Sequence, residues 1–284
     1  MDYRIELLVR KYKRSGLMGV ARSIFFLVTR KIFPFELRAD LRRRKIGQRL
    51  HREFNGEVRY GVFKGLKLPV DLVWAKNDLA SLLIGFYEQQ VIEWVSDRGI
   101  RFSQFIDIGS ADGFYLAGIL KAELADSVLG FESSSVGRAS SLKLLELNKL
   151  ENRSRVFGSA DSNFMEVARQ HGESDSDRWS LLMCDIEGGE LDLFDIRTAE
   201  LLKKYFLVIE LHEWTYSSGD LENLEMIFSA THALEFLSTS TRNPSAIFEL
   251  RELSDDERWN LCSEGRRHEM RWLVGIPHLY GGLT

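Results

Sequence analysis

The sequence of 284 residues contains little proline and little cysteine, 4 and 2 residues respectively. So few prolines, together with an apolar content of 44%, exclude collagen-like and fully disordered chains. The two cysteines, Cys184 and Cys262, belong to no CxxC pair and to no Cys/His cluster. Their spacing argues against a disulfide scaffold and a structural zinc site, and it predicts a reducing, cytoplasmic compartment.

Long apolar runs are also lacking. No stretch reaches 18 consecutive apolar residues, so we expect no membrane-spanning helix. The first residues do not have the form of a signal peptide, because Asp2, Arg4 and Glu6 are scattered among the apolar ones. At about 100–200 residues per domain, the length allows one large domain or two small ones.

The charge is unevenly distributed. Residues 1–52 contain 15 Lys/Arg and 4 Asp/Glu, a net of +11, which leaves the rest of the chain at −15. Apolar residues fall at helical spacing from Gly16 to Phe35, and Arg42–Lys45 adds four consecutive cations. We therefore expect residues 1–54 to form a basic helical arm.

Three partners are compatible with this arm. It could pack on the main domain as a helical cap, with its cations in solvent. It could instead lie on an anionic membrane surface, at the inner face of the membrane, through residues 16–52. Nucleic acid is the third partner, but the acidic remainder of the chain argues against a wide phosphate-binding face.

Residues 55–76 alternate between apolar and polar side chains and predict a β-hairpin connector. The alternating apolar positions are Val58, Tyr60 and Val62, then Leu66, Leu68 and Val70. Gly65 lies between the two sets and permits a tight reversal.

Residues 77–284 alternate short apolar runs with helical patterns. We expect strands at Phe105–Ile108, Val128–Phe131, Arg155–Phe157, Leu181–Cys184, Phe206–Leu211, Leu234–Ser238 and Arg271–Ile276. Such alternation predicts an α/β fold: a Rossmann-like, mostly parallel seven-stranded sheet with helices on both faces, preceded by the helical and hairpin extension. Ligands of such sheets bind at the carboxyl ends of the strands, so the residues just after each strand are the informative ones.

The first predicted strand ends in a glycine-containing turn, Asp107-Ile108-Gly109-Ser110-Ala111-Asp112-Gly113. Glycine is suited to places where the backbone approaches a ligand or takes a positive φ. The binding residues that we expect here are Asp107, Gly109, Ser110, Ala111, Gly113, Phe114 and Tyr115. Only two glycines are present, four residues apart, so this is not the GxGxxG turn of a dinucleotide fold.

Glu132 directly follows the second predicted strand, and Ser133 comes next. A carboxylate offers only acceptors, so Glu132 can receive both hydroxyls of a ribose. After the third strand, Ala160 or Asp161 could bound an adenine base, although an exposed loop aspartate is an equally good interpretation of Asp161.

The richest polar cluster follows the fourth and fifth predicted strands. Asp185, Glu187 and Glu190 lie within six residues of a strand end, and Glu210 and His212 lie two apart on one side of the next strand. One hypothesis is that His212 acts as a general base, oriented by Glu210 or by the following glutamate, Glu213.

A second hypothesis for the same cluster is a divalent metal such as Mg²⁺, bound by Asp185, Glu210 and His212. Glu187 and Glu190 have a further possible role, because carboxylates stabilise the N-terminus of the helix that we expect to follow.

Together these residues resemble the FkbM-type family of class I S-adenosylmethionine-dependent methyltransferases. The resemblance rests on the ordered set Asp107-Ile108-Gly109 with Gly113, Phe131-Glu132, Asp185-Ile186-Glu187-Gly188-Gly189-Glu190 and Glu210-Leu211-His212, with Gly85-Phe86-Tyr87-Glu88 similar to the family's G-x-Y-E. It covers roughly Asn77 to Pro277. Two residues depart from the family pattern: Ala111 stands where Asn is usual, and Cys184 stands where Lys is usual.

The resemblance implies S-adenosylmethionine as cofactor and O-methylation as the reaction, often of sugar hydroxyls in glycans or natural products. It also implies that Tyr87 and Glu88 contact cofactor or substrate. We therefore expect a methyltransferase whose acceptor is a small molecule or a glycan. The alternatives are a non-catalytic cofactor-binding module tethered by the basic arm, an RNA methyltransferase, and a nicotinamide-dependent oxidoreductase, which the missing third glycine disfavours.

Overall fold

The computed structural model describes residues 35–171, 178–266 and 268–281. The chain divides into two units, Met1–Arg42 and Arg43–Thr284, and each is considered by itself. The helix expected from Gly16 onward lies almost wholly outside the described residues. Among those that are described, no helix is both long enough and apolar enough to cross a membrane.

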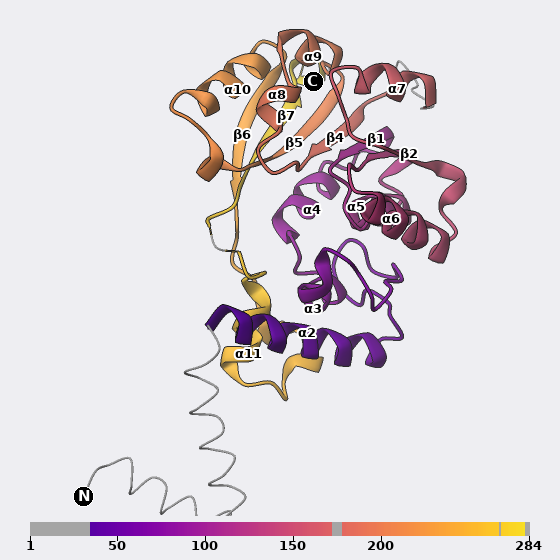
Figure 1. Ribbon diagram of the computed structural model, residues 1–284, viewed down its shortest axis with the longest axis vertical. Helices are drawn as coiled ribbons and strands as arrows, with labels where there is room; N and C mark the ends of the chain where they lie inside the picture. The colour runs from indigo at the N-terminus through magenta and orange to yellow at the C-terminus, as the bar shows by residue number, and fades with distance from the viewer. Residues whose placement is uncertain (1–34, 172–177, 267, 282–284) are drawn as a thin grey trace, which may run out of the picture. The chain divides into compact units, whose positions relative to one another are not determined.

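A seven-stranded sheet forms the centre of the second unit (Figure 1). Its strands, in chain order, are β1 (Phe102–Ile108), β2 (Ala125–Phe131), β3 (Ser154–Phe157), β4 (Ser180–Cys184), β5 (Tyr205–Leu211), β6 (His232–Ser238) and β7 (Arg271–Pro277). They are arranged in the order β3-β2-β1-β4-β5-β7-β6. Strands β1 to β5 pair in parallel, and β7 runs antiparallel to both of its neighbours. The predicted sheet is confirmed, including the existence of all seven strands.

Helices cover both faces of this sheet, as its buried residues show. On β4, Leu181 and Met183 belong to one apolar core, whereas Leu182 and Cys184 belong to the other. The first core includes α4 (Gln89–Ser96), α5 (Phe114–Lys121) and α6 (Ser135–Leu147), and the second includes α7 (Phe164–His171), α9 (Ile196–Leu201) and α10 (Asp220–Ser229) (Figure 1). Because alternate side chains of a strand point to opposite faces, two-sided burial explains the continuous apolar runs of the sequence.

Five further α-helices are described outside these two groups. They are α2 (Phe35–Glu53), α3 (Leu79–Leu83), α8 (Glu190–Leu193), α11 (Asp255–Cys262) and α12 (His278–Gly281), of which α2 crosses the boundary between the two units. Ile46, Leu50 and Phe54 are buried in the same core as α4 and α5. The last part of the segment expected to be an arm therefore packs within the second unit.

The β-hairpin expected over residues 55–76 is present only as a short antiparallel reversal, not as two strands. The structure places no strand in this segment and only one antiparallel pair, Glu57 with Lys67. The Arg59 N–H donates to the Leu83 carbonyl at 2.7 Å, outside the segment. The N–H groups of Val58 and Leu68 donate to the carbonyl oxygens of Leu66 and Gly56 at 2.8 and 2.7 Å, so the two alternating halves face each other, but too few residues pair to form strands.

Phe63, from this same segment, is packed into the core of the second unit. It is 3% exposed, and its ring makes edge-to-face contacts with Phe114 and Tyr115, at centroid distances of 5.2 and 6.1 Å. We expect Phe63→Ala to lower the free energy of unfolding by about 3–5 kcal/mol, through lost burial and the cavity left behind. Denaturant unfolding monitored by circular dichroism measures this change.

Phe248→Ala is the matched control for that substitution, because the Phe248 side chain is 66% exposed. Its effect should stay within about 0.5 kcal/mol. Equal losses for the two variants would show that residues 55–76 are not part of the folded core.

Candidate active site

A cavity of about 670 Å³ opens at the carboxyl ends of the parallel strands. The predicted binding residues that line it are Glu88, Asp107, Gly109, Ser110, Ala111, Phe114, Tyr115, Glu132, Ser133, Ala160 and Asp185. This is where ligands bind in open parallel sheets, and the volume is typical of a site for a small molecule.

Gly109 allows the first turn to approach the end of β4. Its φ is +91°, and a Cβ added there would lie 1.8 Å from the Asp185 carbonyl oxygen, so no other residue fits. Gly113, at φ +80°, stands at the start of α5, where an added Cβ would lie 2.9 Å from Ser141. Gly113 does not line the cavity, so the structure gives it a role in packing the loop.

Glu132 holds the glycine loop from the end of β2. Its two carboxylate oxygens accept the N–H of Ala111 at 2.9 Å and the N–H of Ser134 at 2.7 Å. Each oxygen keeps a further lone pair, so the hydroxyls of a ribose can still be accepted. The Ser110 hydroxyl, also at the cavity, is buried without a hydrogen-bond partner among the described residues. A polar ligand would satisfy this buried group.

The cavity is strongly acidic. Its lining contains seven carboxyl groups, those of Asp78, Glu88, Asp107, Asp112, Glu132, Asp185 and Glu187, and no Lys, Arg or His is among the described residues that line it. Burial, with the nearby charges of Glu132 and Glu88, raises the pKa of Asp107 to about 8. Such a site favours a cationic ligand and disfavours a phosphate.

Asp112 is a structural residue of the site that the sequence did not single out. Its carboxylate accepts the N–H groups of Val73, Trp74 and Ala75 at 2.9, 2.8 and 3.0 Å, and the hydroxyl of Ser140 at 2.5 Å. The only available signal was a carboxylate lying between the two glycines of the turn. Asp112 fixes residues 73–75 to the glycine loop.

Ala160 and Asp161, the two candidate binding residues after β3, differ in their position relative to the cavity. Ala160 and its neighbour Ser159 line the cavity. Asp161 is exposed, does not line the cavity, and accepts the N–H of Asn163 at 2.8 Å just before α7. Of the two interpretations of Asp161, its position supports the one of an ordinary loop residue.

His212 lies among three carboxylates. Its Nδ1 is 3.3 Å from Glu190 Oε1, and its Nε2 is 3.4 Å from Asp185 Oδ1 and 3.5 Å from Glu187 Oε2. The imidazole is 2% exposed and does not itself line the cavity, whereas Asp185 and Glu187 do. Burial lowers the pKa of His212, but the hydrogen bond and charge of Glu190, with the charges of Glu210 and Glu187, outweigh it and raise that pKa.

The partners expected for His212 must be corrected. Glu190, not Glu210 or Glu213, contacts its Nδ1, and Glu213 instead pairs with Arg271 at 2.7 Å. Glu210 Oε1 accepts a hydrogen bond from Arg266 at 2.8 Å. Burial and the charge of Glu88, opposed by Arg266, raise the pKa of Glu210 to about 7.

The group that could hold a metal is likewise not the expected trio. Asp185, Glu187 and His212 place ligand atoms within 4.8 Å of one another, so Glu187 takes the place predicted for Glu210. One imidazole nitrogen and two carboxylate oxygens suit a divalent cation, and Glu190 at Nδ1 provides the carboxylate that usually orients a metal-bound histidine. These residues fit the ion that the second hypothesis requires.

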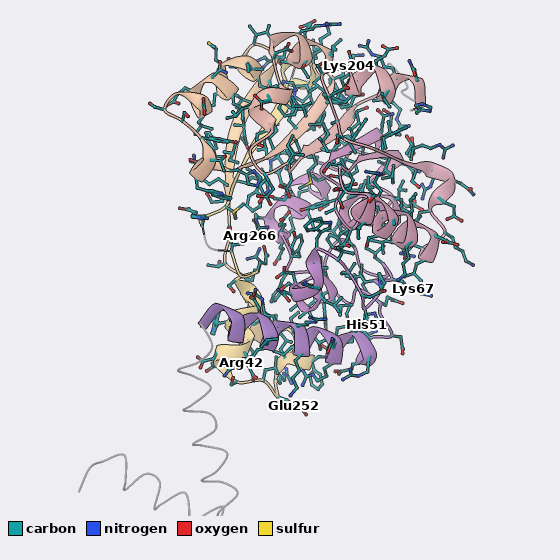
Figure 2. All side chains as sticks on the ribbon, in the orientation of Figure 1. Arg42, His51, Lys67, Lys204, Glu252 and Arg266 are labelled. Atoms are coloured by element: carbon teal, nitrogen blue, oxygen red, sulfur yellow. The ribbon has the colours of Figure 1, made fainter. Side chains whose placement is uncertain are left out.

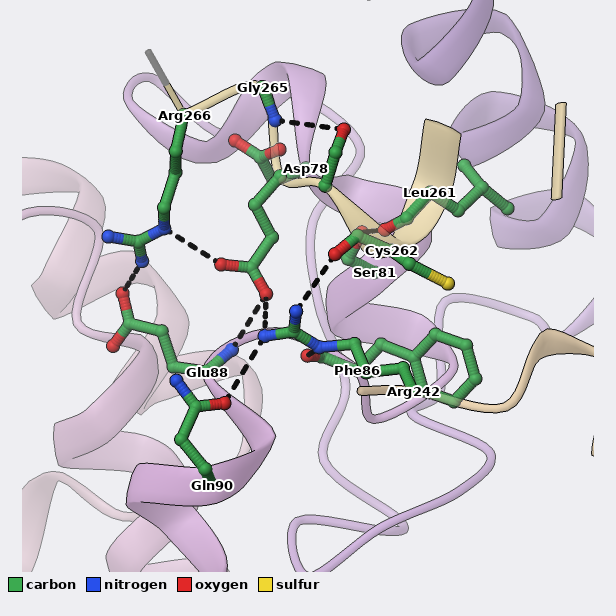
Figure 3. Close-up of polar contacts among 12 residues, drawn as sticks. Asp78, Ser81, Phe86, Glu88, Gln90, Arg242, Leu261, Cys262, Gly265 and Arg266 are labelled. Atoms are coloured by element: carbon green, nitrogen blue, oxygen red, sulfur yellow. Dashed lines mark hydrogen bonds and ion pairs between the residues drawn. The ribbon is translucent and has the colours of Figure 1, made fainter. Parts of the chain in front are cut away.

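A buried ionic network lies beside the cavity (Figure 3). Arg266, from the segment between α11 and β7 (Figure 2), forms ion pairs with Glu88 and with Glu210 and donates from Nε to Glu264 at 2.9 Å. The Tyr115 hydroxyl donates to Glu88 at 2.6 Å. The network therefore joins a cavity-lining carboxylate to the end of β5.

Arg242 extends the same network. It pairs with Glu264 and donates to the carbonyl oxygens of Phe86 at 2.6 Å and Cys262 at 2.8 Å (Figure 3). Neither Arg242 nor Arg266 was predicted from the sequence. Both lie in loop segments, and most of their partners are distant along the chain.

Three residues that line the cavity have strained backbones. Glu88, Ala111 and Glu187 have φ values of +43°, +45° and +56°, a region that residues other than glycine rarely occupy. Strain of this kind is concentrated at functional sites and persists only where surrounding contacts enforce it. Asparagine tolerates this conformation better than alanine does, so Ala111 is a strained choice at its position.

Comparisons with known proteins establish the fold. No family model and no curated protein sequence matches the chain. The solved structure of human methyltransferase 10 domain containing protein is similar, with a TM-score of 0.51 and 17% identity over 86% of this chain and 98% of that one. The METTL16 methyltransferase domain has a TM-score of 0.46 and 18% identity, over 74% of this chain and 73% of that one.

The tRNA methyltransferase TrmK of B. subtilis gives a TM-score of 0.39 and 12% identity over 64% of this chain, and the match spans 63% of TrmK. Together with the strand order described above, the similarity to the human methyltransferase 10 domain containing protein shows the fold, a Rossmann-like α/β methyltransferase fold.

The buried cation of the network can be tested by substitution. Arg266 is 17% exposed and holds three carboxylates. We expect Arg266→Leu to lower the free energy of unfolding by about 3–5 kcal/mol, because it leaves buried carboxylates unpaired. Arg271→Leu is the control: it removes a partly exposed pair with Glu213 and should lower that free energy by about 1 kcal/mol or less. Similar losses in urea titrations of the two variants would refute a special role for the network.

Proposed function

We propose that this protein is an S-adenosylmethionine-dependent O-methyltransferase of the FkbM type, acting on a hydroxyl group of an uncharged acceptor. The observation that carries the proposal is the acidic cavity in a methyltransferase fold, with seven carboxyl groups in its lining. S-adenosylmethionine carries a sulfonium and an ammonium group against a single carboxylate. Its net positive charge complements this lining.

The sequence motifs and the cavity suggest one orientation for the cofactor. Asp107 and Glu88 would face the ammonium end, and the glycine loop would follow the methionine chain. Glu132 would accept the ribose hydroxyls, and Ser159 and Ala160 would border the adenine.

A sugar hydroxyl, in a glycan or a natural product, is the acceptor that we propose. An uncharged saccharide can donate hydrogen bonds to carboxylates, whereas a nucleic-acid backbone would be repelled by them. We also keep membrane contact by residues 16–52 as a proposal. In the described part of this range, Arg44, Lys45 and Arg52 of α2 are exposed, as binding to anionic lipid requires.

The acceptor hydroxyl must lose its proton as it attacks the methyl group. We propose that the cluster of Asp185, Glu187 and His212 serves this step, with Glu190 orienting the imidazole. A divalent cation bound by these three residues would lower the pKa of the hydroxyl. Without a cation, Asp185 or Glu187, which line the cavity, would pass the proton to His212 Nε2.

Binding of S-adenosylhomocysteine should depend on pH through Asp107. Because the pKa of Asp107 is about 8 in the free protein, the carboxyl group is protonated below that pH, whereas the ammonium group of the ligand, proposed to face Asp107, favours the ionised form. We therefore expect the affinity to rise from pH 6 to pH 8, by up to about tenfold per pH unit, with release of a proton. Calorimetry in buffers of different ionisation enthalpy measures both quantities.

Asp107→Asn should remove this pH dependence and weaken binding. Asp161→Asn, the same substitution at an exposed aspartate, should leave both unchanged. No binding of S-adenosylhomocysteine to the wild-type protein at any pH would overturn the proposed function.

His212 should be needed for turnover and not for cofactor binding. We expect His212→Ala to keep its affinity for S-adenosylhomocysteine and to lose at least about 10²-fold in methyl transfer, the usual contribution of a positioned base. Transfer of radiolabelled methyl groups to a panel of neutral glycosides measures the rate, and Glu213→Ala is the neighbouring control. Turnover retained in His212→Ala would rule out this assignment, and loss of wild-type turnover with a chelator would select the metal-bound form.

A further inference from the structure

Trp74 differs from the other aromatic residues at the cavity. Phe114 makes edge-to-face contacts with Tyr87 and with Tyr115, and Phe131 packs against Phe157 and Phe164. Trp74 makes no such ring contact among the described residues, and it is 58% exposed while lining the cavity. It offers a large aromatic surface that the folded chain itself does not use.

The backbone of Trp74 is nevertheless held firmly. Its N–H donates to Asp112 Oδ2 at 2.8 Å, and the N–H groups of both neighbouring residues donate to the same carboxylate. Asp112 is buried at 3% exposure. An exposed indole on a fixed backbone is preorganised for binding, because less conformational freedom is lost when a ligand stacks on it.

The hydrogen bonds also indicate which part of a ligand Trp74 would meet. Asp112 directly follows Ala111, whose N–H donates to Glu132 at 2.9 Å. Two hydrogen bonds and one peptide link therefore connect Trp74 to Glu132, the carboxylate proposed for the ribose. Among the described residues, no link of this length runs from Trp74 to Asp185 or His212.

From this geometry we propose that Trp74 stacks on the adenosyl group of the cofactor and closes the nucleoside end of the cavity. The inference rests on the proposed function and adds a binding residue that neither the motifs nor the resemblance supplies. Stacking of a base on an aromatic side chain contributes about 5- to 150-fold in affinity. Asp112 makes the glycine loop and this stacking surface one unit, so the loop that binds the methionine chain also positions the indole.

The test is titration of the full-length protein with S-adenosylhomocysteine and with 5′-methylthioadenosine, which has the nucleoside but lacks the amino acid. We expect Trp74→Ala to weaken both ligands by the same factor, within the range above, and Trp74→Phe to restore most of the loss. Trp259→Ala is the matched control, because Trp259 on α11 is 57% exposed and does not line the cavity. It should leave both affinities unchanged.

A spectroscopic readout separates stacking from a general structural effect. Both ligands should quench tryptophan fluorescence in the wild type and in Trp259→Ala, and the quenching should be reduced in Trp74→Phe, which still binds. Unchanged affinity for both ligands in Trp74→Ala would overturn the inference and leave the proposed function intact; the indole would then be free for the methyl acceptor. A loss for S-adenosylhomocysteine without a loss for 5′-methylthioadenosine would also overturn it. Absence of binding to the wild type would instead reject the proposed function.

Discussion

The placement of one buried guanidinium among carboxylates is the constraint on which the rest of this site depends. Glu88, Glu210 and Glu264 come from distant parts of the chain, and their charges would repel one another in a poorly hydrated interior. Arg266 contacts all three and offsets that repulsion. The same contacts attach the segment before β7 to the end of β5 and to the start of α4.

This network also explains how the site tolerates its local strain. Glu88 has a positive φ and is buried, yet the Tyr115 hydroxyl, Arg266 and the Glu264 carboxylate all hold it. Because these contacts over-determine its position, the strained conformation persists. Arg266 does not line the cavity, and its charge is paired with carboxylates. The described lining therefore stays acidic and suits a positively charged ligand.

Much of the fold and part of the site could be predicted from the sequence, because both depend on local patterns. Strands buried on two faces are continuous apolar runs, and a parallel sheet brings their carboxyl ends together, so Asp107, Glu132 and Asp185 could be expected at one cavity. Asp112, Trp74 and Arg266 could not, because their roles come from contacts between segments far apart in the chain. The same holds for the hydrogen bond from the Arg59 N–H to the Leu83 carbonyl, because no pattern within residues 55–76 records that partner.

The sequence pattern predicts Glu210 beside His212, whereas the structure places Glu187 there. The difference arises because the two-residue periodicity of a strand no longer applies once the strand has ended. Glu210 and His212 lie two apart, and within a strand they would share one face. However, β5 ends at Leu211, and His212 already has a turn conformation, with φ −97° and ψ +53°. Its imidazole therefore meets Glu187, in the loop after β4, and Glu190, the first residue of α8, while Glu210 stays with Arg266. The end of one strand thus separates two sets of carboxylates, one held by an arginine and one grouped around a histidine. Only the second set is arranged to take up a proton or a metal ion.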